Sequence, residues 1–314
     1  MTDASSDGSP EPEFTTAFDP RYGRAVEVSP GILRVTANNP SPFTFAGTNS
    51  YVVGDDGRCF VVDPGPPDDA HLAALIAAVG GRPVDAVVLT HAHADHSALA
   101  NEFSSRVSAP LYGARPAAVA EDGAVTRVDA PVEGGIAYRR HLEDGETLRL
   151  GGFDVEVVAT PGHASDHVAL ALTGSDVLLS GDHVMAWSTS VVAPPDGAMG
   201  DYMASLQKLL GRPESRYLPG HGGPVERPGR FVRGLIHHRR MREAAIVGRL
   251  EAGDETIPAI VAAIYPGLDA RLSGAASLSV LAHLMELERQ GTVREDTAGP
   301  GAAGERVYRL AAGE

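Results

Sequence analysis

Four side chains that can bind metal ions end the stretch VVLTHAHADH, residues 87–96. They are His91, His93, Asp95 and His96. Neutral imidazole and carboxylate suit zinc, and also iron or manganese. His91 and His93 are spaced to reach one ion, and the turn after them offers two more donors for a second ion. The stretch therefore predicts a metal centre that holds more than one ion.

Three further residues of the same types follow apolar runs later in the chain. His163 in TPGHASDH, Asp182 in LLSGDH and His221 in YLPGH each stand directly after a glycine. Glycine lets the backbone turn sharply where side chains crowd around one centre. Five histidines and two aspartates are therefore expected to converge from separate strand ends.

Other polar residues near these motifs are candidates for orienting the ligands. Asp166 and His167 follow His163 closely, and Asp63 ends the strand in VVDPG. A carboxylate or imidazole there could accept or donate a hydrogen bond at the free nitrogen of a ligand histidine. For Asp63 a simple turn is the alternative. His183, next to Asp182, is expected to pack in the core.

The elements that must position these residues alternate between strands and helices. The chain predicts strands within 25–37, 43–55, 58–65 and 84–90, then within 146–160, 167–173, 176–182 and 216–221,. It predicts helices at 68–81, 96–107 and 201–211,. Polar clusters stand where strands end, which indicates an α/β layer fold with its site at the strand termini.

Near Pro228 the sequence pattern changes from alternating strands and helices to mainly helices. Residues 230–251, 256–265 and 273–291 predict three helices, and 292–310 predicts a hairpin, which is the order of a winged helix. The third helix carries Arg289 as its single base, whereas a DNA-reading helix is basic. We therefore expect residues 229–314 to serve packing or dimerisation, giving a possible homodimer.

Composition argues against a nucleic-acid-binding protein and against a membrane-spanning one. Of 314 residues, 21% are charged, and the net charge of −15 disfavours general binding to nucleic acid,. No apolar run approaches the roughly 20 residues of a membrane span. The lone cysteine, Cys59, fits a reducing compartment, so we expect a cytoplasmic protein,. Residues 1–24 predict a disordered acidic tail before a catalytic domain at 25–228,.

The ligand set resembles that of the metallo-β-lactamase-fold hydrolases. Their His-x-His-x-Asp-His loop, later His, Asp and final His correspond to His91, His93, Asp95, His96, His163, Asp182 and His221. The motifs GTNSYVVG, DYMASLQKLL and HHRRMREAAI, with the winged-helix-like end, are similar to the β-lactamase-like protein 2 branch. Glyoxalase II is a more distant relative, and its lysine-containing glutathione clamp is missing here because Lys208 is the only lysine.

The resemblance implies an αβ/βα sandwich with a small C-terminal winged-helix-like domain. It also implies two divalent ions per chain, for which we expect zinc, with iron and manganese as alternatives. His163 would complete the first site, His221 the second, and Asp182 would bridge them. Asp95 and Asp182 are the residues expected to serve catalysis, which would use a hydroxide shared by the two ions.

The expected activity is metal-dependent hydrolysis of an ester or thioester of a small or carrier-bound acyl group. Related proteins also cleave single-stranded RNA, so an endoribonuclease is the alternative, and an interaction module without activity is a minor one. Arg239 and Arg242 lie in the basic run at 237–242 and could hold a substrate phosphate or carboxylate,. A solvated helix face is the alternative reading of that run.

Overall fold

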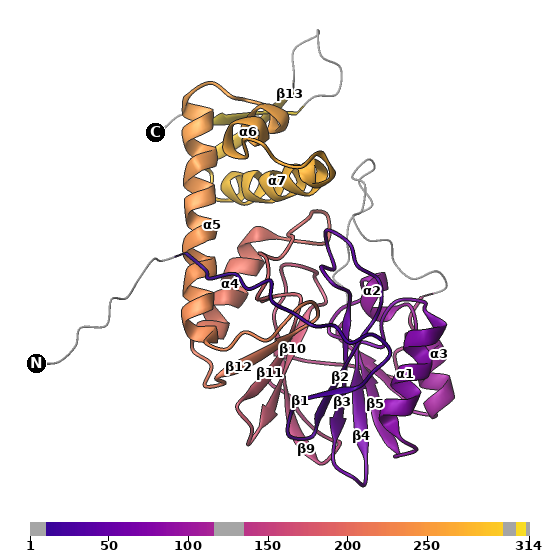
Figure 1. Ribbon diagram of the computed structural model, residues 1–314. Helices are drawn as coiled ribbons and strands as arrows, with labels where there is room; N and C mark the ends of the chain where they lie inside the picture. The colour runs from indigo at the N-terminus through magenta and orange to yellow at the C-terminus, as the bar shows by residue number, and fades with distance from the viewer. Residues whose placement is uncertain (1–10, 116–134, 298–305, 312–314) are drawn as a thin grey trace, which may run out of the picture.

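The computed structural model describes residues 11–115, 135–297 and 306–311. Within them, two β-sheets pack face to face with helices on both outer surfaces, and a smaller helical part follows (Figure 1). This arrangement confirms the α/β class and the αβ/βα sandwich expected from the sequence.

The first sheet comes from the N-terminal half of the chain. Its strands lie in sequence order: β1 (Val26–Ser29), β2 (Ile32–Thr36), β3 (Asn49–Gly54), β4 (Cys59–Val62), β5 (Val84–Val88), β6 (Leu111–Gly113) and β7 (Arg140–His141). β1 to β4 pair antiparallel, and β4 to β7 pair parallel. Sequence analysis missed β6 and β7, because runs of three and two residues are too short to show alternation,.

The second sheet comes from the middle of the chain. Its order is β12 (Arg216–Pro219), β11 (Val177–Gly181), β10 (Val168–Thr173), β9 (Phe153–Ala159) and β8 (Thr147–Leu150). β8 to β11 pair antiparallel, while β11 and β12 run parallel. Gly181 and Pro219 therefore lie side by side at the carboxyl ends of these two strands, close in sequence to the expected ligands Asp182 and His221.

Successive side chains of a strand point to opposite faces of the sheet, so each sheet contributes to the core between the sheets and to a core under the outer helices,. In β3, Val53 joins the core between the two sheets, whereas Val52 points outward onto α1 (Asp69–Val79) and α3 (Ala100–Val107),. On the second sheet, Leu178 faces α4 (Met199–Leu210) and α5 (Pro228–Glu251). Cys59 is buried in the layer under α1.

The helix expected at 96–107 is broken in two. A short α2 (Ala94–Ser97) precedes α3, and Leu99 lies between them. The hydroxyl of Ser97 donates to the carbonyls of Ala92 and His93 at 2.9 Å each. The amide of Leu99 donates to the carbonyl of Gly65 at 3.1 Å. These bonds hold the turn that carries the ligand motif, which periodicity alone does not reveal.

The C-terminal part has the expected order of elements. α5 is followed by α6 (Ile257–Ile264), the 3-10 turn η1 (Ala270–Leu272), α7 (Ser273–Arg289) and the hairpin β13 (Val293–Thr297) with β14 (Arg306–Leu310). The first half of α5 packs in the core under the second sheet, and its second half packs against α6, α7 and the hairpin. One long helix therefore joins the two parts (Figure 1).

The N-terminal segment differs from the expected disordered tail. Residues 1–10 lie outside the described residues, but 11–24 run in an extended course along the body. Pro12 is buried directly above Gly234 of α5, where a Cβ would come within 2.8 Å of the Pro12 nitrogen. The ring of Phe14 meets Phe231 edge-on at 5.9 Å. Apolar contacts thus hold a segment whose composition alone suggested disorder.

The helices of the described chain are too short or too polar to cross a membrane.

Candidate metal centre

The seven candidate ligands come together at one edge of the sandwich. The loop after β5 carries four of them, and the other three follow β9, β11 and β12. Their donor atoms form three overlapping groups, each within 4.8 Å: His91, His93 and His163; His91, His96 and Asp182; Asp95, His96 and His221. The convergence expected from the sequence is therefore present in the structure.

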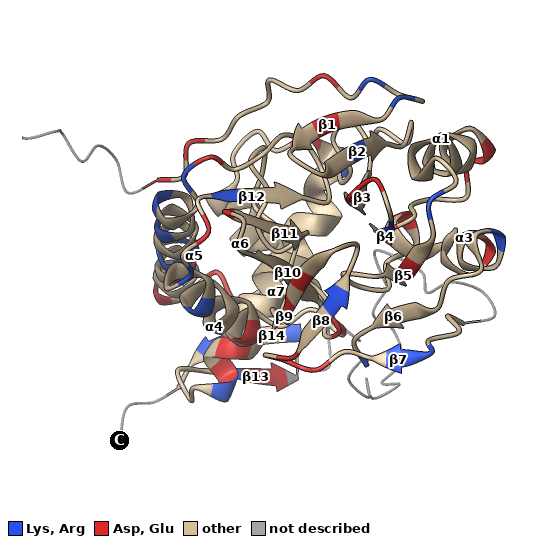
Figure 2. Cartoon of the chain, turned by 90° about the horizontal axis from the view of Figure 1, so that it is seen from below, with Lys and Arg blue, Asp and Glu red and all other residues tan. Residues whose placement is uncertain are grey.

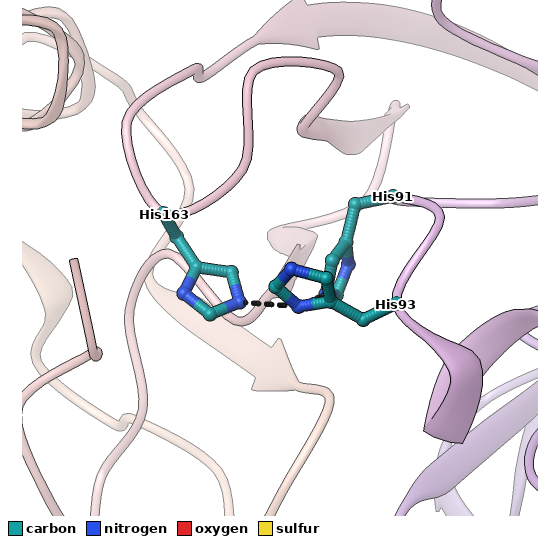
Figure 3. Close-up of side chains that lie close together, drawn as sticks. All are labelled: His91, His93 and His163. Carbon is teal, nitrogen blue, oxygen red and sulfur yellow. Dashed lines mark hydrogen bonds between the residues drawn. The ribbon is translucent and has the colours of Figure 1, made fainter. Parts of the chain in front are cut away.

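The first group consists of three histidines from two loops. Nδ1 of His93 lies 3.0 Å from Nε2 of His91 and 3.1 Å from Nε2 of His163. Figure 3 shows His163 reaching across from the second sheet toward the pair on the ligand loop. Three ring nitrogens thus face one point.

The other two groups share His96 and bring in the carboxylates of Asp182 and Asp95. Nε2 of His221 lies 3.2 Å from both Oδ2 of Asp95 and Oδ2 of Asp182. Asp182 also approaches the first group, because its Oδ2 lies 3.8 Å from Nε2 of His163. Asp182 therefore lies between the first group and the third.

The outward ring nitrogens of the ligand histidines meet protein oxygens. Nδ1 of His163 donates to the carbonyl of Val191 at 2.6 Å, and Nδ1 of His221 donates to that of Gly47 at 3.2 Å. A carbonyl can only accept, so in the neutral ring the proton is on Nδ1 and Nε2 keeps its lone pair for the centre. This is the arrangement in which histidine binds a cation.

One carboxylate oxygen gives a further test of fit. Oδ1 of Asp182 is buried and accepts no hydrogen bond from the described part of the chain. Buried acceptors are seldom left without a partner. The ring nitrogens that face one point and this carboxylate oxygen fit divalent cations, so the residues present suit the metal ions that the resemblance implies.

The charges in the cluster are strongly coupled. Burial lowers the pKa of His91 well below its usual value, and neighbouring histidines lower it further. Burial also acts against protonation of His221, but Asp182 and Asp95 outweigh it and raise the pKa of His221 to about 9. Burial would raise the pKa of Asp182, yet His221 and His96 hold that pKa well below its usual range.

Glycine is required beside the cluster. A Cβ on Gly220 would come within 2.3 Å of Oδ1 of Asp182 and 2.6 Å of Cε1 of His96. No larger residue fits there unless a ligand moves. The glycine before His221 is therefore a packing requirement of the centre itself.

Two of the three residues expected to orient ligands are hydrogen-bonded to candidate ligands. Oδ2 of Asp63 lies 2.9 Å from Nδ1 of His96. His167 accepts from the amide of Asp182 at 3.0 Å through Nε2, and its Nδ1 lies 2.8 Å from Oγ1 of Thr160. Asp166 is buried, which raises its pKa to about 7, with Asp196 adding to the rise. His183 is buried against the ring of Tyr202, as expected for a packing residue.

Two polar residues beside the ligands were missed by sequence analysis. Thr48 Oγ1 donates to Oδ2 of Asp95 at 3.3 Å. Oδ2 of Asp196 lies 4.0 Å from Nε2 of His93, while Oδ1 accepts from Oγ of Ser165 at 2.6 Å. Neither residue stands in a ligand motif, although Thr48 belongs to the GTNSYVVG stretch.

The two arginines expected to bind substrate have different surroundings. Arg239 is 4% exposed, and its guanidinium donates to the carbonyl of Ser190. That placement differs from the expected role, because these donors are used inside the protein. Arg242 is half-buried, with its guanidinium 4.3 Å above the ring centroid of Tyr265.

Comparison with known proteins decides the family. The family model described as the metallo-beta-lactamase superfamily matches residues 43–221, which is more than half of the chain and includes all seven candidate ligands. The chain belongs to the metallo-β-lactamase superfamily. A second model, the beta-lactamase associated winged helix domain, matches residues 256–301. The expected family and the winged-helix end are thus confirmed.

Individual relatives and structures agree with this placement. A beta-lactamase-like protein 2 homolog of Drosophila melanogaster is 31% identical over 271 residues, 84% of this chain and 89% of that protein. An atrochrysone carboxyl ACP thioesterase of Cryptosporiopsis sp. is 28% identical over 231 residues, 72% of this chain and 64% of that protein. A beta-lactamase domain protein from Burkholderia ambifaria shares the fold, with a TM-score of 0.78, 24% identity and coverage of 96% and 97%.

Proposed function

We propose that this superfamily member is a dinuclear metal-dependent hydrolase that acts on an ester or thioester of a small or carrier-bound acyl group. The observation that carries the proposal is the convergence of five imidazoles and two carboxylates with their donor atoms facing one centre. No serine or cysteine nucleophile is needed, and Cys59 is buried at the start of β4.

The ligand assignment follows from which donors lie together. His91, His93 and His163 would hold one ion, and Asp95, His96 and His221 the other. Asp182 would contact both, because its two oxygens face different members of the cluster. We expect zinc at both positions, since imidazole and carboxylate donors suit it, and iron or manganese remain alternatives.

The chain's own residues prepare the site for hydrolysis. Divalent cations bound there supply Lewis acidity and make water nucleophilic near neutral pH. Thr48 holds one oxygen of Asp95, and Asp63 fixes the ring of His96. His167 fixes the backbone at Asp182. These hydrogen bonds keep the carboxylates and imidazoles in place when substrate enters.

The acyl substrate class rests on two observations. A relative that spans most of the chain is named as a thioesterase of an acyl carrier protein. The protein carries a net charge of −15, which disfavours a long polyanion that must contact several phosphates. A carrier-bound acyl group presents one reacting carbonyl and few charges, so it suits both observations.

Arg242 is the residue that we propose to hold an anionic part of the substrate. Figure 2 shows basic residues along α5, which joins the catalytic body to the winged helix. Arg242 is half-buried on this helix. A guanidinium is suited to one phosphate or carboxylate, such as the phosphate of a pantetheine arm.

A hydrolysis panel on zinc-loaded protein tests the proposal. The panel contains an acyl phosphopantetheine thioester, a neutral aryl ester and single-stranded RNA, and Asp182→Asn serves as the inactive control. We expect ester and thioester turnover that exceeds RNA cleavage and disappears in the control. Efficient RNA cleavage at physiological salt with inert thioesters would replace this proposal with an endoribonuclease.

We also propose a location in the reducing interior of the cell. The thiol of Cys59 is buried and free, so the fold needs no disulfide,.

A further inference from the structure

Arg239 is buried where α5 contacts the loop that follows Asp182. We propose that Arg239 is a positioning residue, which holds residues 183–198 so that this loop orients His163 and Asp182. The inference rests on the proposed function only in taking those two residues as metal ligands.

The first link runs from Arg239 to His163. Nη2 of Arg239 donates to the carbonyl of Ser190. The carbonyl of the next residue, Val191, accepts from Nδ1 of His163 at 2.6 Å. Because two successive carbonyls belong to one short stretch of backbone, fixing the first restricts the second. Arg239 thereby sets both the tautomer and the direction of the His163 ring.

The second link runs from the same loop to Asp182. Oγ of Ser190 donates to the carbonyl of Asp182, and also to that of His183 at 2.9 Å. Ser190 is therefore tied to Arg239 through its backbone and to the ligand segment through its side chain. A shift of Ser190 would move both ligands together.

The surroundings of Arg239 keep its guanidinium in place. It stacks over the ring of Tyr202 at 5.1 Å, and the Tyr202 hydroxyl donates to the carbonyl of His183 at 3.2 Å. Its other terminal nitrogen donates to Oγ of Ser279 in α7 at 3.4 Å. The fixed fork of an arginine can serve the loop and α7 at once, which a lysine ammonium on a flexible stem does less well.

The variants Arg239→Met and Arg239→Lys test this role, and Arg240→Met is the matched control because Arg240 is the exposed neighbour on the same helix. Zinc affinity is measured by competition with a chelator on protein whose folding is checked by circular dichroism. We expect about a tenfold loss of zinc affinity in Arg239→Met, the lower end of the range for residues that orient ligands. Arg239→Lys should lose less, and the control should match the wild type.

A spectroscopic readout separates positioning from simple stabilisation. Cobalt-substituted protein reports ligand geometry through its visible absorption, which should change in Arg239→Met and stay unchanged in Arg240→Met. If Arg239→Met does not fold, Ser190→Ala takes its place, because it removes the side-chain hydrogen bonds to the carbonyls of Asp182 and His183 and leaves the Ser190 backbone in place. An altered spectrum with weaker zinc binding is then expected again.

Two outcomes would overturn the inference. One is a lower melting temperature with wild-type zinc affinity and cobalt spectrum, which would make Arg239 a structural residue alone. The other is unchanged metal binding with a raised KM for anionic substrates only, which would make it a substrate anchor. A wild-type protein that binds no zinc would instead refute the proposed function, so the two failures are distinct.

Discussion

Oδ2 of Asp63 lies 2.9 Å from Nδ1 of His96, and both side chains are buried. The same carboxylate accepts from the amide of Thr90 at 2.8 Å and from its hydroxyl at 2.7 Å. Asp63 has a left-handed backbone with φ of 51°, which is uncommon for a residue other than glycine. This local backbone strain places a hydrogen-bond acceptor at Nδ1 of His96, a candidate ligand,.

Replacing Asp63 by Asn should weaken zinc binding by about 10- to 100-fold, because the ring of His96 loses a charged acceptor that fixes its direction. Competition with a chelator measures the effect. The matched control is Asp69→Asn, an exposed aspartate at the start of α1. Equal affinities in the two variants would show that Asp63 serves only the turn.

Purified protein reconstituted with zinc should contain two ions per chain by mass-spectrometric metal analysis. Asp182→Ala should lose metal and most of the activity, because the residue between both donor groups is gone. The exposed Asp201 of α4 provides the control, Asp201→Ala. A stable content of one ion or none in the wild type would contradict the dinuclear centre.

Arg242→Gln should lower kcat/KM for anionic acyl substrates by roughly ten- to a hundredfold, which corresponds to about 1.5–3 kcal/mol for a hydrogen bond between charged groups. Neutral aryl esters should be spared, since they offer no charge to hold. Arg240→Gln is the control on the exposed face of the same helix. Equal losses for both substrate types would assign Arg242 to the packing against Tyr265 instead.

The full chain should show no tight, salt-sensitive binding to duplex DNA in a fluorescence anisotropy titration. α7 has the place of a recognition helix, but its only base, Arg289, is paired with Glu286 at 2.7 Å. Residues 229–314 hold 11 bases and 11 acids, so their net charge is zero. Tight binding to duplex DNA that weakens steeply with added salt would contradict the expected packing role of residues 229–314.

Stability should depend on pH through His71 in α1. Burial lowers the pKa of His71 to about 4, and its Nε2 lies 2.9 Å from Oγ of Ser50. The unfolded chain binds this proton near pH 6.5. The stability that the neutral, buried His71 contributes is therefore fully present above pH 6.5. The free energy of unfolding falls as the pH drops toward 4, by up to roughly 3 kcal/mol.

Urea unfolding of metal-free protein at pH 7 and pH 5 measures the dependence. His71→Asn should lose less stability than the wild type between those values, because its amide does not titrate. The exposed His141 supplies the control, His141→Asn. Parallel losses in wild type and His71→Asn would refute the assignment.

The convergence of the candidate ligands could be predicted from sequence because their signals are local. His91 to His96 share one turn, and each later ligand directly follows an apolar strand and a glycine. The order of strands and helices was readable for the same reason, since alternation shows within a few residues. Elements with little local signal were missed, such as β7, and α2 was merged with α3.

The sequence by itself determined which residues are candidate metal ligands and which family of folds presents them, because residue type and spacing carry that information. Only the tertiary structure decided what holds those residues in place. The carbonyl of Val191 meets His163 from 28 residues away, and Arg239 reaches Ser190 from 49 residues away. Residue type indicated that Arg239 could bind an anion, but Arg239 is buried and donates to the backbone carbonyl of Ser190. Contacts between distant segments depend on how whole layers pack, and no short stretch of sequence encodes that packing.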